Sequence, residues 1–305
     1  GFQNIIDPSR HWYHYEMAPE LYTHIYKGRW PESVNRSRSH PQEAQYEDER
    51  GWTALHIAAD DNAPVSVVSS LLAAFPSATV IQNKKGCTAL HYACDNSSHE
   101  VVRLLLQTDV SCINIRGMRN EHSRTPLQDL CRWPGNEMLI QRALKRKIPS
   151  SNNRNNEQTP SSIILNQDEE LTKVWNKANL LIKASYHGTI ENPLPDGKAF
   201  RIVHACAGIR DCPYRLTKLA IRLHPEQLQM VDEDGNIPFQ LAVRSGKTWS
   251  RGIKAFLEAS PAVLVGHDGL IDQKFYPCVL DFLGRKSSIS TLFVMLKEIP
   301  ELMAS

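Results

Sequence analysis

The composition of this 305-residue chain is that of a globular protein, and it excludes several functions. Apolar residues make up 41% of the chain and charged residues 22%, and the net charge is only +2. A charge so close to neutral argues against general binding to nucleic acids or membrane surfaces. No apolar run approaches the roughly 18 residues that a membrane span needs. We therefore expect neither nucleic acid nor membrane as a partner.

The cysteines indicate a compartment. There are seven, an odd number without a Cys-x-x-Cys pair, which predicts reduced thiols inside a cell. We expect an intracellular protein, cytoplasmic in the first instance, with a nuclear location as the alternative.

Residues 1–16 are predicted to form an N-terminal tail. This stretch has neither the basic start nor the apolar core of a secretory signal. The sequence begins with Gly1 rather than methionine, which leaves open that it is a fragment of a longer protein. From Pro19 to Ala44, two short helical patterns are separated by Lys27 and Gly28. We interpret them as a degenerate first repeat that caps an array.

A short block recurs along the chain. The nine residues GWTALHIAA at Gly51 return as GCTALHYAC at Gly86, 35 residues later. Weaker copies follow, and the threonine position of the block marks the series: Thr53, Thr88, Thr125, Thr159, Arg201, Ile237 and Tyr276. A second marker is a proline that stops each amphipathic stretch: Pro41, Pro76, Pro149, Pro225, Pro261 and Pro300. Two markers that share a period of about 35 predict a helical solenoid.

The block G-x-T-x-L-H-x-A-A, followed by an amphipathic helix, resembles the ankyrin repeat. The matching residues are Gly51, Thr53, Leu55, His56, Gly86, Thr88, Leu90 and His91. The resemblance implies an all-α ankyrin-repeat solenoid of about seven or eight stacked helix-turn-helix repeats with short hairpin-like fingers. We predict a single domain over residues 17–305, with repeats near 17–49, 50–84, 85–121, 122–156, 157–197, 198–233, 234–272 and 273–305.

Residues 86–94 raise the question of a metal or thiol site. His91 and Cys94 are three residues apart and would share one face of a helix, as chelating ligands must. However, Cys94 falls in a column of small residues, where cysteine behaves as a small hydrophobe: Ala59, Cys94, Cys131, Ala207 and Val243. The resemblance implies that His91 bonds backbone groups of adjoining turns. We therefore interpret this block as packing.

A second cluster, HACAGIRDC at residues 204–212, is also interpreted as packing. His204 and Cys206 are two residues apart and lie about 200° apart around a helix, so they cannot clasp one ion. A structural zinc site also needs four converging ligands. We predict no metal and no cofactor. Of the other thiols, Cys112 is expected to point inward and Cys87 to be exposed.

The sequence contains none of the motifs GxxxxGK[ST], GxGxxG after a strand, GxSxG or HExxH, and we predict that the protein is not an enzyme. The acidic run DEDG at residues 232–235 lacks the ligand spacing of a calcium loop, so we interpret it as a solvated turn. The basic run LKRK at residues 144–147 is interpreted as the last turn of a helix. A nuclear import patch is the alternative.

The resemblance implies a scaffold or adaptor for protein-protein interaction, a monomer that binds protein partners with its concave surface and fingers. One alternative is a regulatory or targeting segment of a larger enzyme. Another is binding of nucleic acid, with a steep salt dependence, through Arg142, Lys145, Arg146 and Lys147.

Two intervals on the finger side exceed the basic period, at residues 111–124 and 185–199. Insertions in solenoids accumulate on one face, which is often the binding face. The first interval is rich in arginine, which suits carboxylate-rich or phosphorylated peptides. The hypothesis is an acidic partner that contacts Trp52, Lys84, Lys85, Arg116, Arg119, His122 and Arg124.

Overall fold

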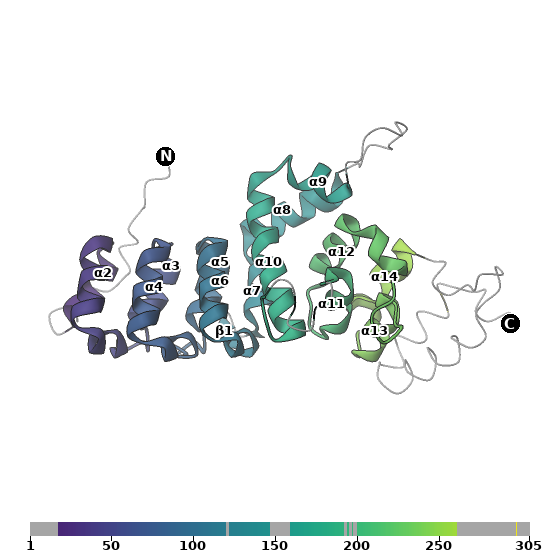
Figure 1. Cartoon of the computed structure of the whole chain (residues 1–305). Helices are drawn as coiled ribbons and strands as arrows, with labels where there is room; N and C mark the ends of the chain where they lie inside the picture. The colour runs from purple at the N-terminus through teal and green to yellow at the C-terminus, as the bar shows by residue number, and fades with distance from the viewer. Residues whose placement is uncertain are drawn as a thin grey trace. The chain divides into compact units, whose positions relative to one another are not determined.

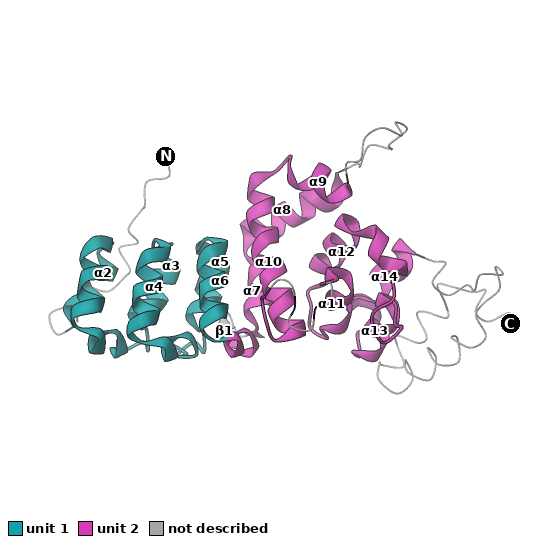
Figure 2. Ribbon diagram, in the orientation of Figure 1, with its two compact units in different colours: residues 1–109 teal, residues 110–305 magenta. Residues whose placement is uncertain are grey.

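The computed structural model describes residues 18–119, 122–146, 159–191, 194, 197, 200–260 and 297. Over these residues the chain is almost wholly helical, with one two-stranded sheet (Figure 1). The chain forms two compact units, Gly1–Asp109 and Val110–Ser305, which Figure 2 colours separately. The all-α prediction is confirmed, and a single continuous domain over 17–305 stays a prediction. The last predicted repeat, 273–305, lies outside the described residues except for residue 297, and Pro149, Pro261 and Pro300 also lie outside them.

The first unit consists of three pairs of helices, each followed by a short turn. Within it, α3 packs against α1 and α5, and α4 packs against α2 and α6, so inner helices stack on inner helices and outer on outer. The elements are α1 (Glu20–Tyr26), α2 (Trp30–Ser39), η2 (Pro41–Gln45), α3 (Ala54–Asp60), α4 (Val65–Ala74), η3 (Pro76–Thr79), α5 (Ala89–Asn96) and α6 (His99–Thr108).

The recurring residues of the block fix where the helices begin and end. Thr53 is the N-cap of α3, and its backbone N–H donates to Nδ1 of His56 at 3.2 Å. Such a reciprocal cap satisfies backbone groups that the first helical turn leaves without partners. Pro41 and Pro76 each begin a 3₁₀ turn directly after an outer helix. Both prolines therefore stop helices as predicted.

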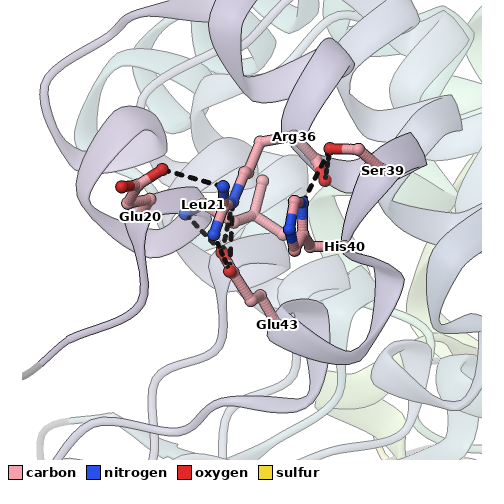
Figure 3. Close-up of polar contacts among 6 residues, drawn as sticks. All are labelled: Glu20, Leu21, Arg36, Ser39, His40 and Glu43. Carbon is pink, nitrogen blue, oxygen red and sulfur yellow. Dashed lines mark hydrogen bonds and ion pairs between the residues drawn. The ribbon is translucent and has the colours of Figure 1, made fainter.

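Charged side chains join the three elements of the N-terminal repeat (Figure 3). Arg36 of α2 lies between Glu20 of α1, with Nη1 2.9 Å from Oε2, and Glu43 of η2, whose Oε1 lies 3.0 Å from Nε. Glu43 also accepts the backbone N–H of Leu21 at 2.9 Å. The hydrogen bond from Arg36 lowers the pKa of Glu43 below its usual value. These contacts join α1, α2 and η2 of the repeat that we predicted from Pro19 to Ala44.

The second unit begins with a two-stranded finger and continues with helices. Its sheet pairs Gly117 with Arg124 and Arg119 with His122 in antiparallel register. The elements are η4 (Val110–Asn114), β1 (Gly117–Arg119), β2 (His122–Arg124), α7 (Pro126–Arg132), α8 (Pro134–Lys145), α9 (Pro160–Leu165), α10 (Glu169–His187), α11 (Ile202–Gly208), α12 (Tyr214–Leu223), η5 (Pro225–Gln229), α13 (Pro238–Arg244), η6 (Trp249–Arg251) and α14 (Ile253–Ala259).

The segment predicted as a repeat near 157–197 departs from the helix-turn-helix pattern. Its α10 is 19 residues long, begins at the N-cap Asp168 and ends at Gly188, whose φ is 67°. This helix packs against both α7 and α11, whereas the outer helix α8 packs directly against α12. In the stack of inner helices, α10 therefore lies between α7 and α11. In the stack of outer helices, α8 is followed directly by α12. Because α10 includes Ser185 to His187, the predicted insertion at 185–199 begins later than expected.

Hydrogen bonds of one kind join successive repeats in both units. Ser97 donates its hydroxyl to the carbonyl of Ala59 at 2.7 Å. Ser245 donates in the same way to Ala207, at 2.9 Å, and in both cases the partners are 38 residues apart. The equivalent geometry shows that the α11 to α13 step repeats the α3 to α5 step, although the sequence motif is weak there.

Candidate functional site

Three turns share one backbone geometry and form the finger tips described here. In each, an Asp or Asn side chain accepts two backbone N–H groups, two and four residues further on. The turns span residues 48–52, 83–87 and 232–236, and the accepting residues are Asp48, Asn83 and Asp232. A short Asp or Asn side chain is well suited to this role because it closes a local turn. The DEDG run is thus a turn, as predicted.

A glycine completes each of these turns. Gly51, Gly86 and Gly235 have φ values of 74°, 69° and 77°, a left-handed conformation that glycine adopts without a steric penalty. Gly51 has a second reason to be glycine, since a Cβ there would lie 3.1 Å from Cα of Asn83 in the next finger. Lys84 donates its backbone N–H to the carbonyl of Arg50 at 2.9 Å, so neighbouring fingers of the first unit are in contact.

The two residues at each tip are exposed, and their charges differ from one finger to the next. The backbone is held by residues before and after the tip, so the tip side chains are not needed for the turn itself. The exposed pairs are Glu49 and Arg50, Lys84 and Lys85, and Glu233 and Asp234. Of the three, only the second pair is wholly basic.

Trp52 is half-buried and held in place by its neighbours. Its ring centroid lies 4.6 Å from that of Tyr92, and the guanidinium of Arg50 lies 5.5 Å from the indole ring. The Tyr92 hydroxyl accepts a hydrogen bond from the amide of Asn83 at 2.7 Å. Trp52 therefore links the first finger to the second, with the Arg50 guanidinium over its ring.

The structure places Arg116 and Arg124 of the predicted cationic set in ion pairs. Arg116 pairs with Asp211 at 2.5 Å and keeps a side-chain exposure of 45%. Arg124 is only 14% exposed and lies 3.7 Å from the carboxylate of Asp129, which is 3% exposed. Arg119 and His122 are backbone partners in the β1–β2 register. Trp52, Lys84 and Lys85 belong to the first unit, and these four residues belong to the second.

The histidines of the block bond backbone groups, as the resemblance implied. Nε2 of His56 lies 3.0 Å from the carbonyl oxygen of Cys87, in the next finger. Nδ1 of His91 accepts the N–H of Thr88 at 3.1 Å. Burial lowers the pKa of His56 to about 4, so the imidazole is neutral at physiological pH. His56 and His91 are completely buried and serve as helix caps.

His204 occupies the same position in a repeat that lacks the threonine. Its Nε2 lies 2.9 Å from the carbonyl oxygen of Met230, two residues before the Asp232 turn, whereas His56 contacts the carbonyl of Cys87, the last residue of the Asn83 turn. Its Nδ1 is buried without a hydrogen-bond partner, and Arg201 stands where Thr53 stands in the earlier repeat. Burial lowers the pKa of His204.

The prediction that Cys87 is exposed is wrong. Its side chain is 0% exposed, because its backbone N–H donates to Oδ1 of Asn83 at 3.1 Å and this closes the turn. Cys112 is buried as predicted, and Cys278 lies outside the described residues. The six described cysteines are free thiols.

The basic run at 144–147 lies at the end of α8. Arg142 and Lys145 are in the last turn of this helix, and Arg146 is its C-cap, which agrees with the helix interpretation. Lys147 lies outside the described residues. Within the described part of the chain, no group of three or more His, Cys, Asp or Glu residues is placed to hold a metal ion. No helix there is long and apolar enough to cross a membrane.

Stacked helix pairs, each with a capped inner helix and a finger turn, define a helical repeat protein. The family model for ankyrin repeats matches residues 24–116 and 55–156, with three copies. Residues 24–156 therefore consist of ankyrin repeats, and the stacked helices continue beyond the matched residues to Ala259. No curated protein matches the chain.

Proposed function

We propose that the chain is a non-enzymatic scaffold or adaptor that binds protein partners through its fingers and the concave surface of its inner helices. Ankyrin repeats are in general modules of protein-protein interaction, and extended concave surfaces of this kind suit such binding. Free thiols at the six described cysteines support a reducing, intracellular location.

One observation carries this proposal: the finger backbones are constant and their tips are variable. Asp48, Asn83 and Asp232 hold their turns in the same way, whereas the exposed tip pairs carry different charges. Residues that the fold does not need, on a rigid support, are where binding specificity is expected.

We propose the finger with Lys84 and Lys85 as the contact for an acidic partner segment, with Arg50 and Trp52 beside it. Both lysines are exposed, and Trp52 offers an aromatic surface that its neighbours already hold in place. Aromatic and cationic residues on preorganised supports are common interface anchors. We propose a second contact region made of Arg116, Arg119, His122 and Arg124. Arg116 is the more exposed of its two ion-paired arginines.

The test is capture of partners from native extract by the wild-type chain and by Lys84→Ala/Lys85→Ala. We expect the double variant to keep its melting temperature within about 2 °C, as surface substitutions usually do, and to lose capture of an acidic protein. Lys173→Ala is the matched control, because Lys173 is an exposed lysine on α10. Equal capture by all three proteins would place the binding surface elsewhere.

The arginines need separate variants. Changing Arg124 to Ala leaves the buried Asp129 carboxylate without this partner, at a cost of about 1–3 kcal/mol. A triple change of Arg116, Arg119 and Arg124 would therefore mix stability with binding. Arg116→Ala alone tests the surface, since its partner Asp211 is 33% exposed and can be hydrated.

The alternative function, a regulatory or targeting segment of a larger enzyme, uses the same surface. The complete reading frame distinguishes it from a free-standing adaptor.

A further inference from the structure

The outer face of α8 exposes large apolar side chains next to basic ones. This face consists of Trp133, Pro134, Met138, Arg142 and Lys145, all of them exposed. The last four recur at helical spacing and therefore form a stripe along one side of the helix. Met138 is 48% exposed and Trp133 is 45% exposed. Side chains of this size are usually removed from solvent, so their exposure on one face needs a reason.

Trp133 and Met138 lie on the same part of this face. Trp133 is the N-cap of α8, but its side chain makes no capping hydrogen bond. A Cβ at Gly135 would lie 3.7 Å from Cδ1 of Trp133, so the indole covers the first turn of the helix. Met138 is three residues after Gly135 and thus on the same side, and helical side chains lean toward the N-terminus. The sulfur of Met138 lies 3.4 Å from Nη2 of Arg142, so indole, thioether and guanidinium follow one another along the helix.

The equivalent position in α4, α6 and α12 is polar. Met138 is the fifth residue of α8, and the fifth residues of those outer helices are Ser69, Arg103 and Lys218. Ser69 and Arg103 are exposed as well, so this position faces solvent in other repeats. The stacking of the helices does not require an apolar side chain there. A partner explains Met138 better than the fold does.

The charge of this face is positive. Arg142 and Lys145 lie in the last turn of α8, and Arg132, which ends α7, is exposed as well. The acidic residue of α8, Glu137, forms an ion pair with Arg215 of α12. The charge that is left for a partner is therefore basic, and the complementary ligand is acidic.

We propose that the outer face of α8 binds an acidic amphipathic helix of a partner protein. Trp133 and Met138 contact the apolar stripe of that helix, and Arg142 and Lys145 pair with its carboxylates. The stripe runs along a helix of 12 residues, about 18 Å, which matches the contact length of a partner helix of about three turns. Methionine adapts to the shape of a partner, and tryptophan and arginine are frequent interface anchors. This surface lies on the outer helices and is separate from the fingers and inner helices proposed above.

The test uses a fluorescein-labelled synthetic peptide of about 16 residues, with leucines at i, i+3, i+4 and i+7 and glutamates at most other positions. We expect it to bind the full chain in a fluorescence anisotropy titration. Met138→Gln and Trp133→Ser should each weaken binding by at least about fivefold, as the loss of an interface anchor does. Glutamine is a good helix former and serine a good N-cap, so both variants should keep their melting temperature within about 2 °C.

Met230→Gln is the matched control for the apolar side chains. Met230 is 44% exposed and lies at the end of η5, outside α8, so this variant should bind the peptide like the wild type. A wild-type chain that does not bind the peptide would overturn the proposal. So would unchanged affinity in both α8 variants, or an equal loss in Met230→Gln.

The basic residues are tested with Arg142→Gln/Lys145→Gln. This variant should weaken peptide binding by roughly fivefold, because two surface ion pairs are lost. Arg103→Gln is the control, since it removes an exposed arginine from α6. A second peptide with lysine in place of glutamate should bind the wild type at least about tenfold more weakly. Equal binding of the two peptides would contradict the acidic partner.

Two further measurements separate this surface from other binding surfaces. Duplex DNA that binds more tightly than the acidic peptide, and loses binding in Arg142→Gln/Lys145→Gln, would identify a nucleic-acid surface and overturn the proposal. Lys84→Ala/Lys85→Ala should bind the acidic peptide like the wild type, because it leaves α8 unchanged. Loss of binding in that finger variant, with Met138→Gln unaffected, would place the acidic helix on the fingers. That result would overturn the role of α8 and leave the function proposed for the fingers in place.

Discussion

The two ring nitrogens of His56 have opposite roles. Nδ1 accepts the backbone N–H of Thr53 at 3.2 Å, so Nε2 carries the proton that it shares with the carbonyl of Cys87. A second proton on Nδ1 would break the cap and place a charge in the core. Burial therefore lowers the pKa of His56 from 6.5 to about 4.

This residue makes stability depend on pH. Between about pH 6.5 and pH 4 the unfolded chain binds a proton at position 56 and the folded chain does not. The free energy of unfolding should therefore fall as the pH drops through this window, by up to about 3 kcal/mol. Urea unfolding at a series of pH values measures the slope.

The chain itself supplies the control for this measurement. Gln128 and Gln240 stand at the histidine position of their repeats and accept the same backbone N–H, at 3.0 Å and 2.9 Å. Glutamine does not titrate, so His56→Gln should keep the cap and reduce the slope between pH 6.5 and pH 4, while the contribution of buried His204 remains. A variant with the same slope as the wild type would show that other groups cause the loss.

At the scale of the elements, a helix or turn can be predicted where residues close together in the sequence determine it. Thr53, Gly51 and His56 act within one turn of chain, so the first two clear repeats can be recognised from sequence alone. The long α10 is not predictable in this way, because its place depends on contacts with α7 and α11. The amide of Gln128 donates to the carbonyl of Asp211, 83 residues away, and no local pattern indicates that contact.

In the candidate site, too, some features follow from the local sequence and others depend on contacts between distant residues. Exposure of Lys84 and Lys85 follows from their place in a turn, which the sequence indicates. The pairing of Arg124 with buried Asp129 depends on how β2 meets α7. Cys87 was predicted to be exposed because it follows the turn glycine, but Asn83 turns its backbone inward.

Successive inner helices are joined by hydroxyl bonds that can be removed one at a time. Ser97→Ala and Ser245→Ala each delete one hydrogen bond to a carbonyl of the preceding repeat. Each should lower the free energy of unfolding by about 1 kcal/mol, the usual net contribution of such a bond. Denaturant unfolding measures this loss.

Ser39 is the control for both changes. Its hydroxyl donates at 3.2 Å to Arg36 within its own helix, at an exposed position. Ser39→Ala should change stability by less than about 0.5 kcal/mol. An equal loss in all three variants would mean that the inter-repeat bonds contribute nothing specific.

At the scale of the whole molecule, each of the two units has its own buried core. Leu90 in the first unit and Leu216 in the second are both 0% exposed. Changing either to alanine should cost about 2–5 kcal/mol, because a cavity replaces packed methyl groups. If each unit unfolds on its own core, this loss should stay within the unit that carries the change.

Hydrogen exchange followed by mass spectrometry reports the helices of each unit in the intact chain. We expect Leu90→Ala to weaken protection in α3 to α6 and to leave α11 to α14 protected, and Leu216→Ala to do the reverse. In a one-dimensional array, stability is a sum of repeat terms and neighbour terms, so strong coupling would spread either loss along the whole chain. Uniform loss of protection in both variants would therefore mean that the two compact units unfold as one.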